Sequence, residues 1–156
     1  MKILIYEDTA RYDFWLKILL GGIIGLTLVL GIASLLWHDV DAALAMFGIT
    51  LFDALLFKAI LPQRFQIFED GVRIDLGGPL SINIPFSSIE RIKSASGRKA
   101  SVYWGIRFAT SSMGVVEIIR KKGLNLVISP SHDELFLEQA NAALELSLFK
   151  LGNNIT

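Results

Sequence analysis

Two long apolar stretches within the first 61 residues constrain this chain more than any other feature. The first, "ILLGGIIGLTLVLGIASLLW", covers residues 18–37, and a polar link over residues 38–41 separates it from the second, residues 42–61. A helix of about 20 residues is about 30 Å long, which matches the hydrocarbon thickness of a bilayer. We therefore predict a transmembrane helical hairpin over residues 15–62, with helices at about 16–37 and 42–61.

Two other interpretations of these stretches are less favoured. The apolar region of a signal peptide covers about 7–15 residues, which is shorter than the first stretch, and here a second apolar stretch follows directly. Alternatively, both helices could be buried in the core of a soluble protein. The rest of the chain is too short to surround two helices that are apolar on all sides.

Basic residues near the two stretches predict their orientation. Cytoplasmic flanks of membrane helices are enriched in Lys and Arg. The connecting link has neither, whereas both outer flanks carry them, namely Lys2, Arg11, Lys17, Lys58, Arg64 and Arg73. We predict a multi-pass protein of the cell (inner) membrane with both termini in the cytoplasm.

Asp53 lies in the second apolar stretch, about two helical turns from its cytoplasmic end. A charged side chain at the bilayer centre costs about 2.5–3.5 kcal/mol and normally faces a protein partner. In an antiparallel hairpin that turns at Asp39, Asp53 lies level with Thr27, so we predict an intramembrane hydrogen bond between them. Its role would be packing within the hairpin or against another subunit. The alternative role is an ion or proton site in a small transporter or channel subunit.

Small residues on the first stretch predict close helix packing. Gly21 and Gly25 are four residues apart, which places them on one face and lets another helix backbone approach. Ala54 lies level with Gly25 in the hairpin. The approaching helix would be the second stretch or a second copy of the chain.

From Gln63 onward the hydrophobic pattern changes from helical to alternating, which is typical of strands. We predict a domain over residues 63–150 with about seven short antiparallel strands in a barrel or sandwich, followed by a C-terminal helix. Ser131 and Glu134 have the spacing of a capping box at the start of that helix. Residues 1–14 are predicted to be a separate cytoplasmic segment and residues 151–156 a tail. Trp104 is expected in the core, and the domain is expected to fold alone.

Three segments resemble a known family of small bacterial membrane proteins in which a transmembrane hairpin precedes a pleckstrin-homology (PH)-like domain. These segments are "FQIFEDGVRI", "INIPFSSIERI" and "LVISPSHDELFLEQANAAL". The resemblance implies an α+β PH-like fold after the hairpin and a membrane-bound, non-catalytic domain. PH domains that bind inositol phosphates carry several basic residues around the first hairpin. Here that hairpin is "FEDGVR", with Glu69 and Asp70 at its tip, which argues against this activity.

The remaining composition limits the possible chemistry. The chain has 15 basic and 15 acidic residues and no Cys, so it offers no strong field for nucleic acid and no thiolate chemistry. His38 and His132 lie far apart, and neither a metal-ligand spacing nor a nucleophile motif is present. We expect no cofactor, no metal and no enzymatic activity. Loose attraction of anionic lipids is one interpretation of Arg120, Lys121 and Lys122; a solvated hairpin tip is the other.

These features together predict a membrane-anchored, non-catalytic PH-like interaction module at the cytoplasmic face. It would dock a protein partner or help to organise a membrane complex. The partners expected are the lipid bilayer and a protein or a second copy of the chain, with no nucleic acid. The alternatives are a transporter or channel subunit that uses Asp53, and weak binding of anionic lipid.

Overall fold

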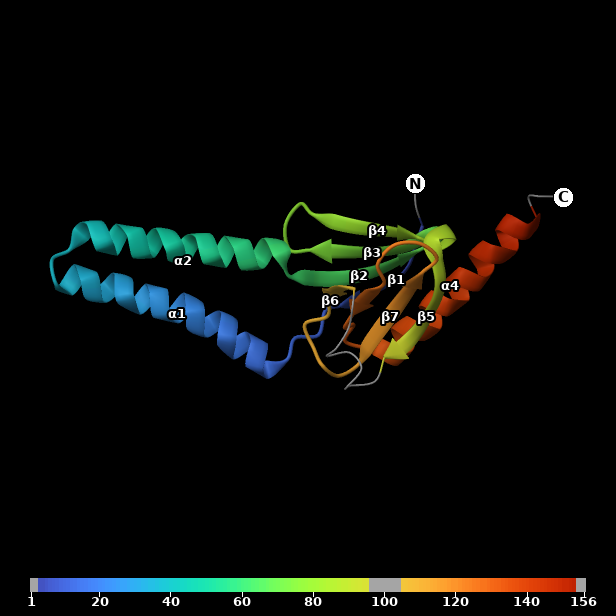
Figure 1. The fold of residues 1–156 in the computed structure, drawn as a ribbon, viewed down its shortest axis with the longest axis horizontal. Helices are drawn as coiled ribbons and strands as arrows, with labels where there is room; N and C mark the ends of the chain where they lie inside the picture. The colour runs from blue at the N-terminus through green and yellow to red at the C-terminus, as the bar shows by residue number, and fades with distance from the viewer. Residues whose placement is uncertain (1–2, 96–104, 154–156) are drawn as a thin grey trace.

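The computed structural model describes residues 3–95 and 105–153. Two long helices extend from one side of a domain that contains two sheets and a third helix (Figure 1). We call the part without the two long helices the β domain. The elements are β1 (Leu4–Thr9), α1 (Phe14–Leu36), α2 (Val40–Ile60), β2 (Pro62–Phe68), β3 (Gly71–Leu76), β4 (Ser81–Pro85), η1 (Phe86–Ser88), β5 (Ile89–Ala95), β6 (Ile106–Phe108), β7 (Val115–Arg120), β8 (Leu126–Ile128) and α4 (Asp133–Asn153).

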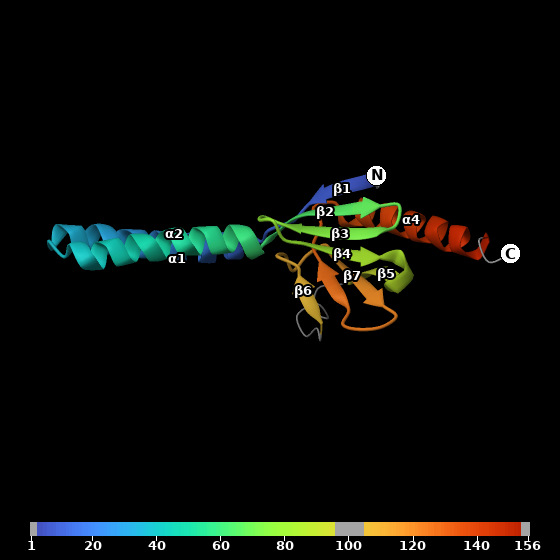
Figure 2. The same cartoon turned by 90° about the horizontal axis from the view of Figure 1, so that it is seen from above.

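Helices α1 and α2 form the expected hairpin and lie side by side in both ribbon views (Figures 1 and 2). Both are long and apolar enough to cross a membrane. Each contains one buried residue, Gly31 in α1 and Ala43 in α2, so almost all their apolar side chains face outward. Core helices of a soluble protein are mostly buried, and these two helices differ from them in that respect. Asp39 begins α2, where its carboxylate accepts a 3.0 Å hydrogen bond from the amide of Ala42.

The strands form two four-stranded sheets. The first has the order β1-β2-β3-β4 and is antiparallel throughout. The second has the order β5-β7-β8-β6, and β6 pairs in parallel with β8. The prediction that all strands are antiparallel is therefore wrong at β6. Within the described residues the sheets do not close into a barrel.

Strand β1 corrects the predicted domain boundary, because residues 1–14 are not a separate segment. β1 pairs with β2 along the edge of the first sheet, with Glu7 opposite Gln66. The long hairpin is therefore inserted between the first and second strands of one sheet. The sequence of β1 has charged residues among its apolar ones, and only Asp8 in it is fully buried. Strands are predicted from the alternation of apolar and polar side chains, and β1 lacks this alternation, so its sequence does not predict a strand.

The core lies between the two sheets and α4, and the alternation seen in the sequence predicts most of it. Most side chains predicted to face inward are buried, among them Phe65, Ile67, Val72, Ile74, Ile84, Ile89, Ile92, Phe136, Ala140, Ala143 and Leu144. Leu80 and Ile106 lie on the apolar faces of their predicted strands but are 55% and 41% exposed. The ring of Phe136 packs edge-to-face against the rings of Tyr6 and Phe65, with both centroid distances at 6.3 Å. Phe149 has the same helical spacing as the buried residues of α4, which predicts that it is buried, but it is 68% exposed.

The start of α4 is stabilised differently from the predicted capping box. The backbone amide of His132 donates a 2.7 Å hydrogen bond to the carboxylate of Asp8, which is supplied by β1. The hydroxyl of Ser131 instead lies 3.1 Å from the hydroxyl of Thr9. A carboxylate from a distant strand thus satisfies one of the free amides at the start of α4. Trp104, the predicted core residue, lies outside the described residues.

Candidate functional site

Several hydrogen bonds join the hairpin to the β domain at the junction between them. Residues 10–13 connect β1 to α1 and pass between the two sheets. The amide of Ala10 donates a 2.9 Å hydrogen bond to the carbonyl of Gln63. The amide of Arg11 donates a 2.8 Å hydrogen bond to the carbonyl of Ser129. The hydroxyl of Thr110 in turn donates to the carbonyl of Arg11 at 2.5 Å. The junction segment therefore ties the first sheet to the second directly beside the start of α1.

Asp13 holds the loop before β7 against the start of α1. Its carboxylate accepts hydrogen bonds from the hydroxyl of Ser111 at 2.6 Å and from the amide and hydroxyl of Ser112, both at 2.9 Å. The indole of Trp15 donates a further bond at 3.3 Å. The bond from Ser111, followed by those from Ser112, lowers the pKa of Asp13 to about 2. Asp13 occupies the N-cap position of α1, yet its side chain bonds to the loop and not to the helix.

The end of α2 is attached to the same domain by two further contacts. The phenol of Tyr12 donates a 2.5 Å hydrogen bond to the carbonyl of Pro62, where α2 passes into β2. The turn after β3 packs on the last turn of α2, because a Cβ atom added at Gly77 would collide with the carbonyl oxygen of Lys58. Both inner ends of the hairpin are thus fixed to the β domain.

We expect Asp13→Ala to release the loop that Asp13 holds. The amide of Ser112 would lose its acceptor, and its hydrogen exchange should accelerate several-fold, because a charged acceptor strengthens a hydrogen bond. The folded-state pKa of Asp13 is depressed, so its stabilisation is complete above its ordinary pKa of 3.8 and is lost as the pH falls toward 2. Hydrogen exchange measured by mass spectrometry on the full chain in detergent would test this.

The matched control is Asp41→Ala, in the first turn of α2 at the far end of the hairpin. It removes a carboxylate of the same kind but leaves the junction untouched. If Asp13→Ala and Asp41→Ala had the same effect on Ser112, the proposed contact would be refuted.

A cavity of about 460 Å³ lies inside this junction. Its apolar wall comes from the start of α1, the end of α2 and β6, with Leu16, Ile60 and Phe108 among its residues. Its polar wall comes from Arg107, Asp13 and the hydroxyl-bearing loop at 110–112. The Nε atom of Arg107 donates a long hydrogen bond, of 3.4 Å, to the carbonyl of Ala109. A cavity of this size with one basic group suits an amphipathic ligand.

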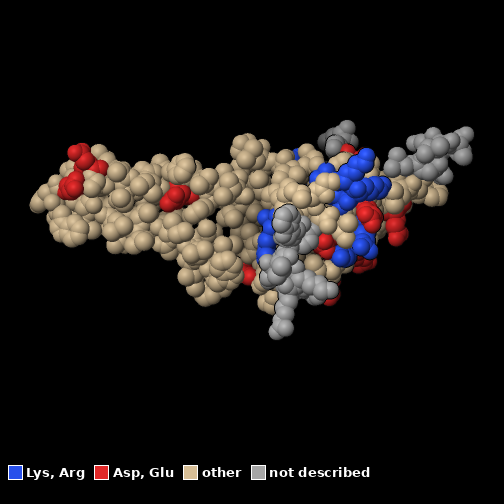
Figure 3. Space-filling model, in the orientation of Figure 1, with Lys and Arg blue, Asp and Glu red and all other residues tan. Residues whose placement is uncertain are grey.

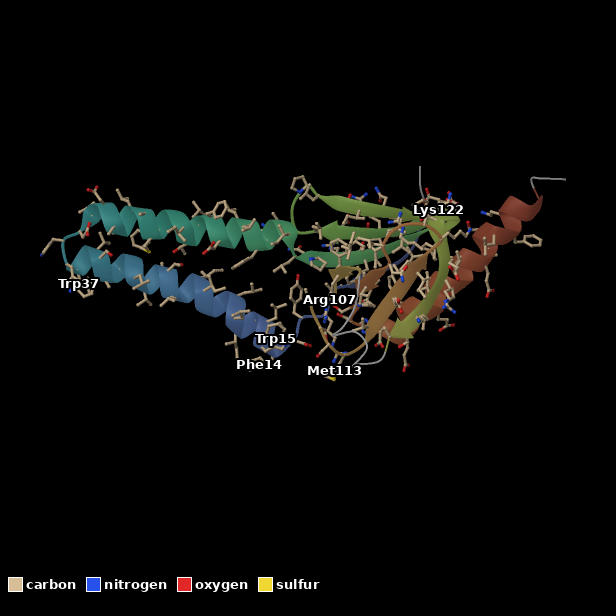
Figure 4. All side chains as sticks on the ribbon, viewed as in Figure 1. Phe14, Trp15, Trp37, Arg107, Met113 and Lys122 are labelled. Carbon is tan, nitrogen blue, oxygen red and sulfur yellow. The ribbon has the colours of Figure 1, made fainter. Side chains whose placement is uncertain are left out.

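Exposed aromatic and apolar side chains surround the junction. Phe14 is 77% exposed, Trp15 61% and Met113 63%. Figure 4 shows these three side chains at the end of α1 nearest the β domain, with Arg107 close by, whereas Trp37 lies at the opposite end of the hairpin. Trp at both ends of a long apolar helix is typical of membrane interfaces.

The structure does not pair Asp53 with Thr27. The hydroxyl of Thr27 donates to the carbonyls of Ile23 and Ile24, at 3.2 and 3.1 Å, and accepts a 2.9 Å hydrogen bond from Thr50. Thr50 lies one turn closer to the connecting link than Asp53. Thr27 is 12 residues before Asp39 and Asp53 is 14 after it, so a turn centred on Asp39 does not bring the two level, and the predicted pair was two residues out of register. Asp53 itself is half-buried, and the structure records no hydrogen bond or ion pair for it within residues 3–95 and 105–153.

The close helix contact also occurs at a different place from the one predicted. A Cβ atom added at Gly31 would lie 2.8 Å from the ring of Phe47, so this glycine brings α1 and α2 together near the link. Gly21 and Gly25 have no atom of another element within 4 Å of such a Cβ, which means that Ala54 does not pack on them. The second helix therefore does not pack on the face of α1 that carries Gly21 and Gly25 within the described residues. A second copy of the chain was the other predicted partner of this face.

The basic cluster at Arg120, Lys121 and Lys122 lies at the end of the β domain remote from the hairpin. The amide of Lys121 donates to the carbonyl of Ser88, and η1 in turn contacts the turn between β2 and β3. β2 leaves α2 directly and spans about 23 Å over its seven residues. Figure 4 shows Lys122 at this remote end. The cluster is thus more than two Debye lengths from the hairpin at physiological ionic strength.

No group of three His, Asp or Glu side chains that could hold a metal ion occurs in the part of the chain that the structure describes. No protein-family model, curated protein or solved structure matches this chain. The resemblance to PH-like membrane proteins therefore stays a prediction that depends on the sequence motifs. Sequence reasoning missed Asp13 and Arg107. The position of Asp13 directly before an apolar helix could have indicated a structural role for it. Nothing in the sequence around Arg107 indicates a site.

Proposed function

We propose that this chain is a membrane-anchored, non-catalytic PH-like interaction module. In this proposal α1 and α2 span the cell membrane, both termini lie in the cytoplasm, and the β domain docks a protein partner there. Lys and Arg are absent from the link at residues 38–41 and present beyond both outer helix ends, which supports that orientation. The bonded junction would hold the β domain at one angle to the membrane surface.

The observation that carries the proposal is the position of the exposed apolar side chains at the two extremes of the molecule. At one extreme the hairpin surface is apolar and almost uncharged, whereas most charged side chains on the face shown gather on the β domain (Figure 3). At the other extreme α4 projects beyond both sheets (Figure 1). Its last turns expose Leu146, Leu148 and Phe149, which are 62%, 45% and 68% accessible. A membrane would cover the first surface, and a partner would cover the second.

The chemistry of the α4 end favours a protein partner with an apolar groove. Leu146 and Phe149 are three residues apart and share one face of the helix. A helix that presents apolar anchors at this spacing binds grooves in other proteins. The end of α4 lies at the opposite extreme of the molecule from the hairpin, so in this proposal it is far from lipid and free to meet a cytoplasmic partner.

We expect a photo-crosslinking residue at position 149 to form one discrete adduct with another protein in intact cells. The adduct should disappear with Leu146→Asp, because a charge on the shared face opposes burial in an apolar groove. Gel electrophoresis followed by mass spectrometry of the adduct would measure this. An adduct of twice the mass of the chain would show that the partner is a second copy.

Two controls accompany this experiment. The same photo-crosslinking residue at position 135, on a half-exposed part of α4 that packs beside the sheets, should not give the adduct. A reporter that is active only outside the cytoplasm, fused after Thr156, should stay silent. Activity of that reporter would reverse the proposed orientation, and a diffuse smear of adducts insensitive to Leu146→Asp would contradict the docking surface.

A further inference from the structure

We propose that the junction cavity binds one anionic phospholipid, with the lipid phosphate at Arg107 and its glycerol and acyl carbons against Leu16 and Ile60. This inference rests on the proposed function, because it requires α1 and α2 to lie in the membrane. It concerns a site separate from the basic cluster at residues 120–122 and from the docking end of α4.

The location of the cavity supports a lipid and not a soluble ligand. Its walls include the first turn of α1 and the last turn of α2, which are the levels at which a spanning hairpin passes from hydrocarbon to headgroups. Trp15 also lines it and is well exposed, as expected for a side chain at the headgroup level. A ligand in this cavity would therefore continue directly into the bilayer.

The distribution of charge in the cavity supports an anionic headgroup. Arg107 lies on the wall formed by β6, on the domain side, with its Nε atom 3.4 Å from the carbonyl oxygen of Ala109. Arg is well suited to phosphate because its planar group donates two parallel hydrogen bonds. The one carboxylate in the wall is Asp13. Ser111, Ser112 and Trp15 all donate to its oxygens, so the repulsion it exerts on a phosphate is reduced.

The volume is consistent with partial enclosure of one lipid. About 460 Å³ is within the range of ligand pockets and is enough for a glycerol phosphate with the first carbons of a chain. The remainder of each acyl chain would run along the outer surface of the hairpin. There Gly21 and Gly25 leave open space beside α1 within the described structure.

The test uses the full chain incorporated in vesicles of equal parts phosphatidylcholine and phosphatidylglycerol, then released into detergent for native mass spectrometry. We expect one retained lipid per chain, enriched in phosphatidylglycerol. Arg107→Gln should lower the ratio of phosphatidylglycerol to phosphatidylcholine on the order of tenfold, because a charge-assisted hydrogen bond is lost. Lys122→Gln removes a cation at the remote end and should change the ratio by less than about twofold.

A second pair of variants tests the cavity without changing any charge. Leu16→Trp would fill the cavity and should abolish retention, whereas Leu19→Trp, at a half-exposed position one turn further on, should not. Equal effects of Arg107→Gln and Lys122→Gln, or full retention with Leu16→Trp, would overturn the proposal. Displacement of the lipid by millimolar glycerol phosphate would also overturn it and assign the site to a soluble phosphate.

Failure here is distinguishable from failure of the proposed function. If alkaline washing removes the chain from vesicles, the membrane placement itself is wrong. If the chain resists washing but binds both lipids equally, only the lipid site is refuted.

Discussion

A fragment of residues 63–150 is expected not to fold cooperatively, although the sequence pattern alone predicts that it will. The fragment lacks β1, so the edge of β2 from Arg64 to Phe68 would lose its hydrogen-bonded neighbour. It would also lose the carboxylate of Asp8 at the start of α4 and the ring of Tyr6 against Phe136. We expect an aggregated or partly structured product with no cooperative thermal transition by circular dichroism.

Restoring β1 without the hairpin should restore folding. Residues 1–12 end close to where β2 begins, because Ala10 donates a hydrogen bond to Gln63 and Tyr12 donates one to Pro62. A Gly-Ser linker of about five residues between Tyr12 and Pro62 would therefore replace α1 and α2 with little strain. We expect this spliced chain of residues 1–12 and 62–153 to be monomeric and to unfold in one transition.

The matched control is the same spliced chain with Asp8→Ala and Tyr6→Ala, which keeps the strand length but removes its two inward contacts. It should be markedly less stable than the unmodified splice. If the 63–150 fragment melted at the same temperature as the splice, β1 would contribute nothing to the domain, and the original boundary would be correct.

The local sequence predicts the buried faces of strands and the lengths of the apolar helices, but not the contacts between distant segments. Period-two alternation identified the buried faces of β2 and β3, because side-chain direction in a strand depends only on position along it. The apolar lengths likewise identified α1 and α2 to within two residues of their ends. These features need no knowledge of which segments meet.

Most of the errors concern which segments meet. Asp8 caps α4 from a strand over 120 residues earlier, and Asp13 bonds to Ser111 and Ser112 nearly 100 residues later. No spacing rule within a window of a few residues could find either pair. The register of the hairpin failed for a different reason. A turn centred on Asp39 already brings Gly31 level with Phe47 and Thr27 level with Leu51, next to Thr50, as the structure has them, so the predicted pair of Thr27 with Asp53 was two residues out of register.

Phe136→Ala in the spliced chain is expected to lower the free energy of unfolding by about 3–5 kcal/mol, the usual cost of removing a buried ring. Phe136 is fully buried and joins α4 to Tyr6 of β1 and Phe65 of β2. Since a domain of this size is stable by about 5–15 kcal/mol, the variant should unfold at much lower denaturant concentration. Urea titration followed by circular dichroism would measure the change.

Leu135→Ala is the matched control, because Leu135 precedes Phe136 on the same helix and is 43% exposed. Its effect should be within about 0.5 kcal/mol, as for other surface positions. A double-mutant cycle of Phe136→Ala with Tyr6→Ala then isolates the contact between α4 and β1. We expect a coupling energy of about 0.5–1.5 kcal/mol, the range for an edge-to-face aromatic pair. Strict additivity of the two substitutions would mean that β1 does not pack against α4 through Tyr6, and the role assigned to β1 in the core would then be wrong.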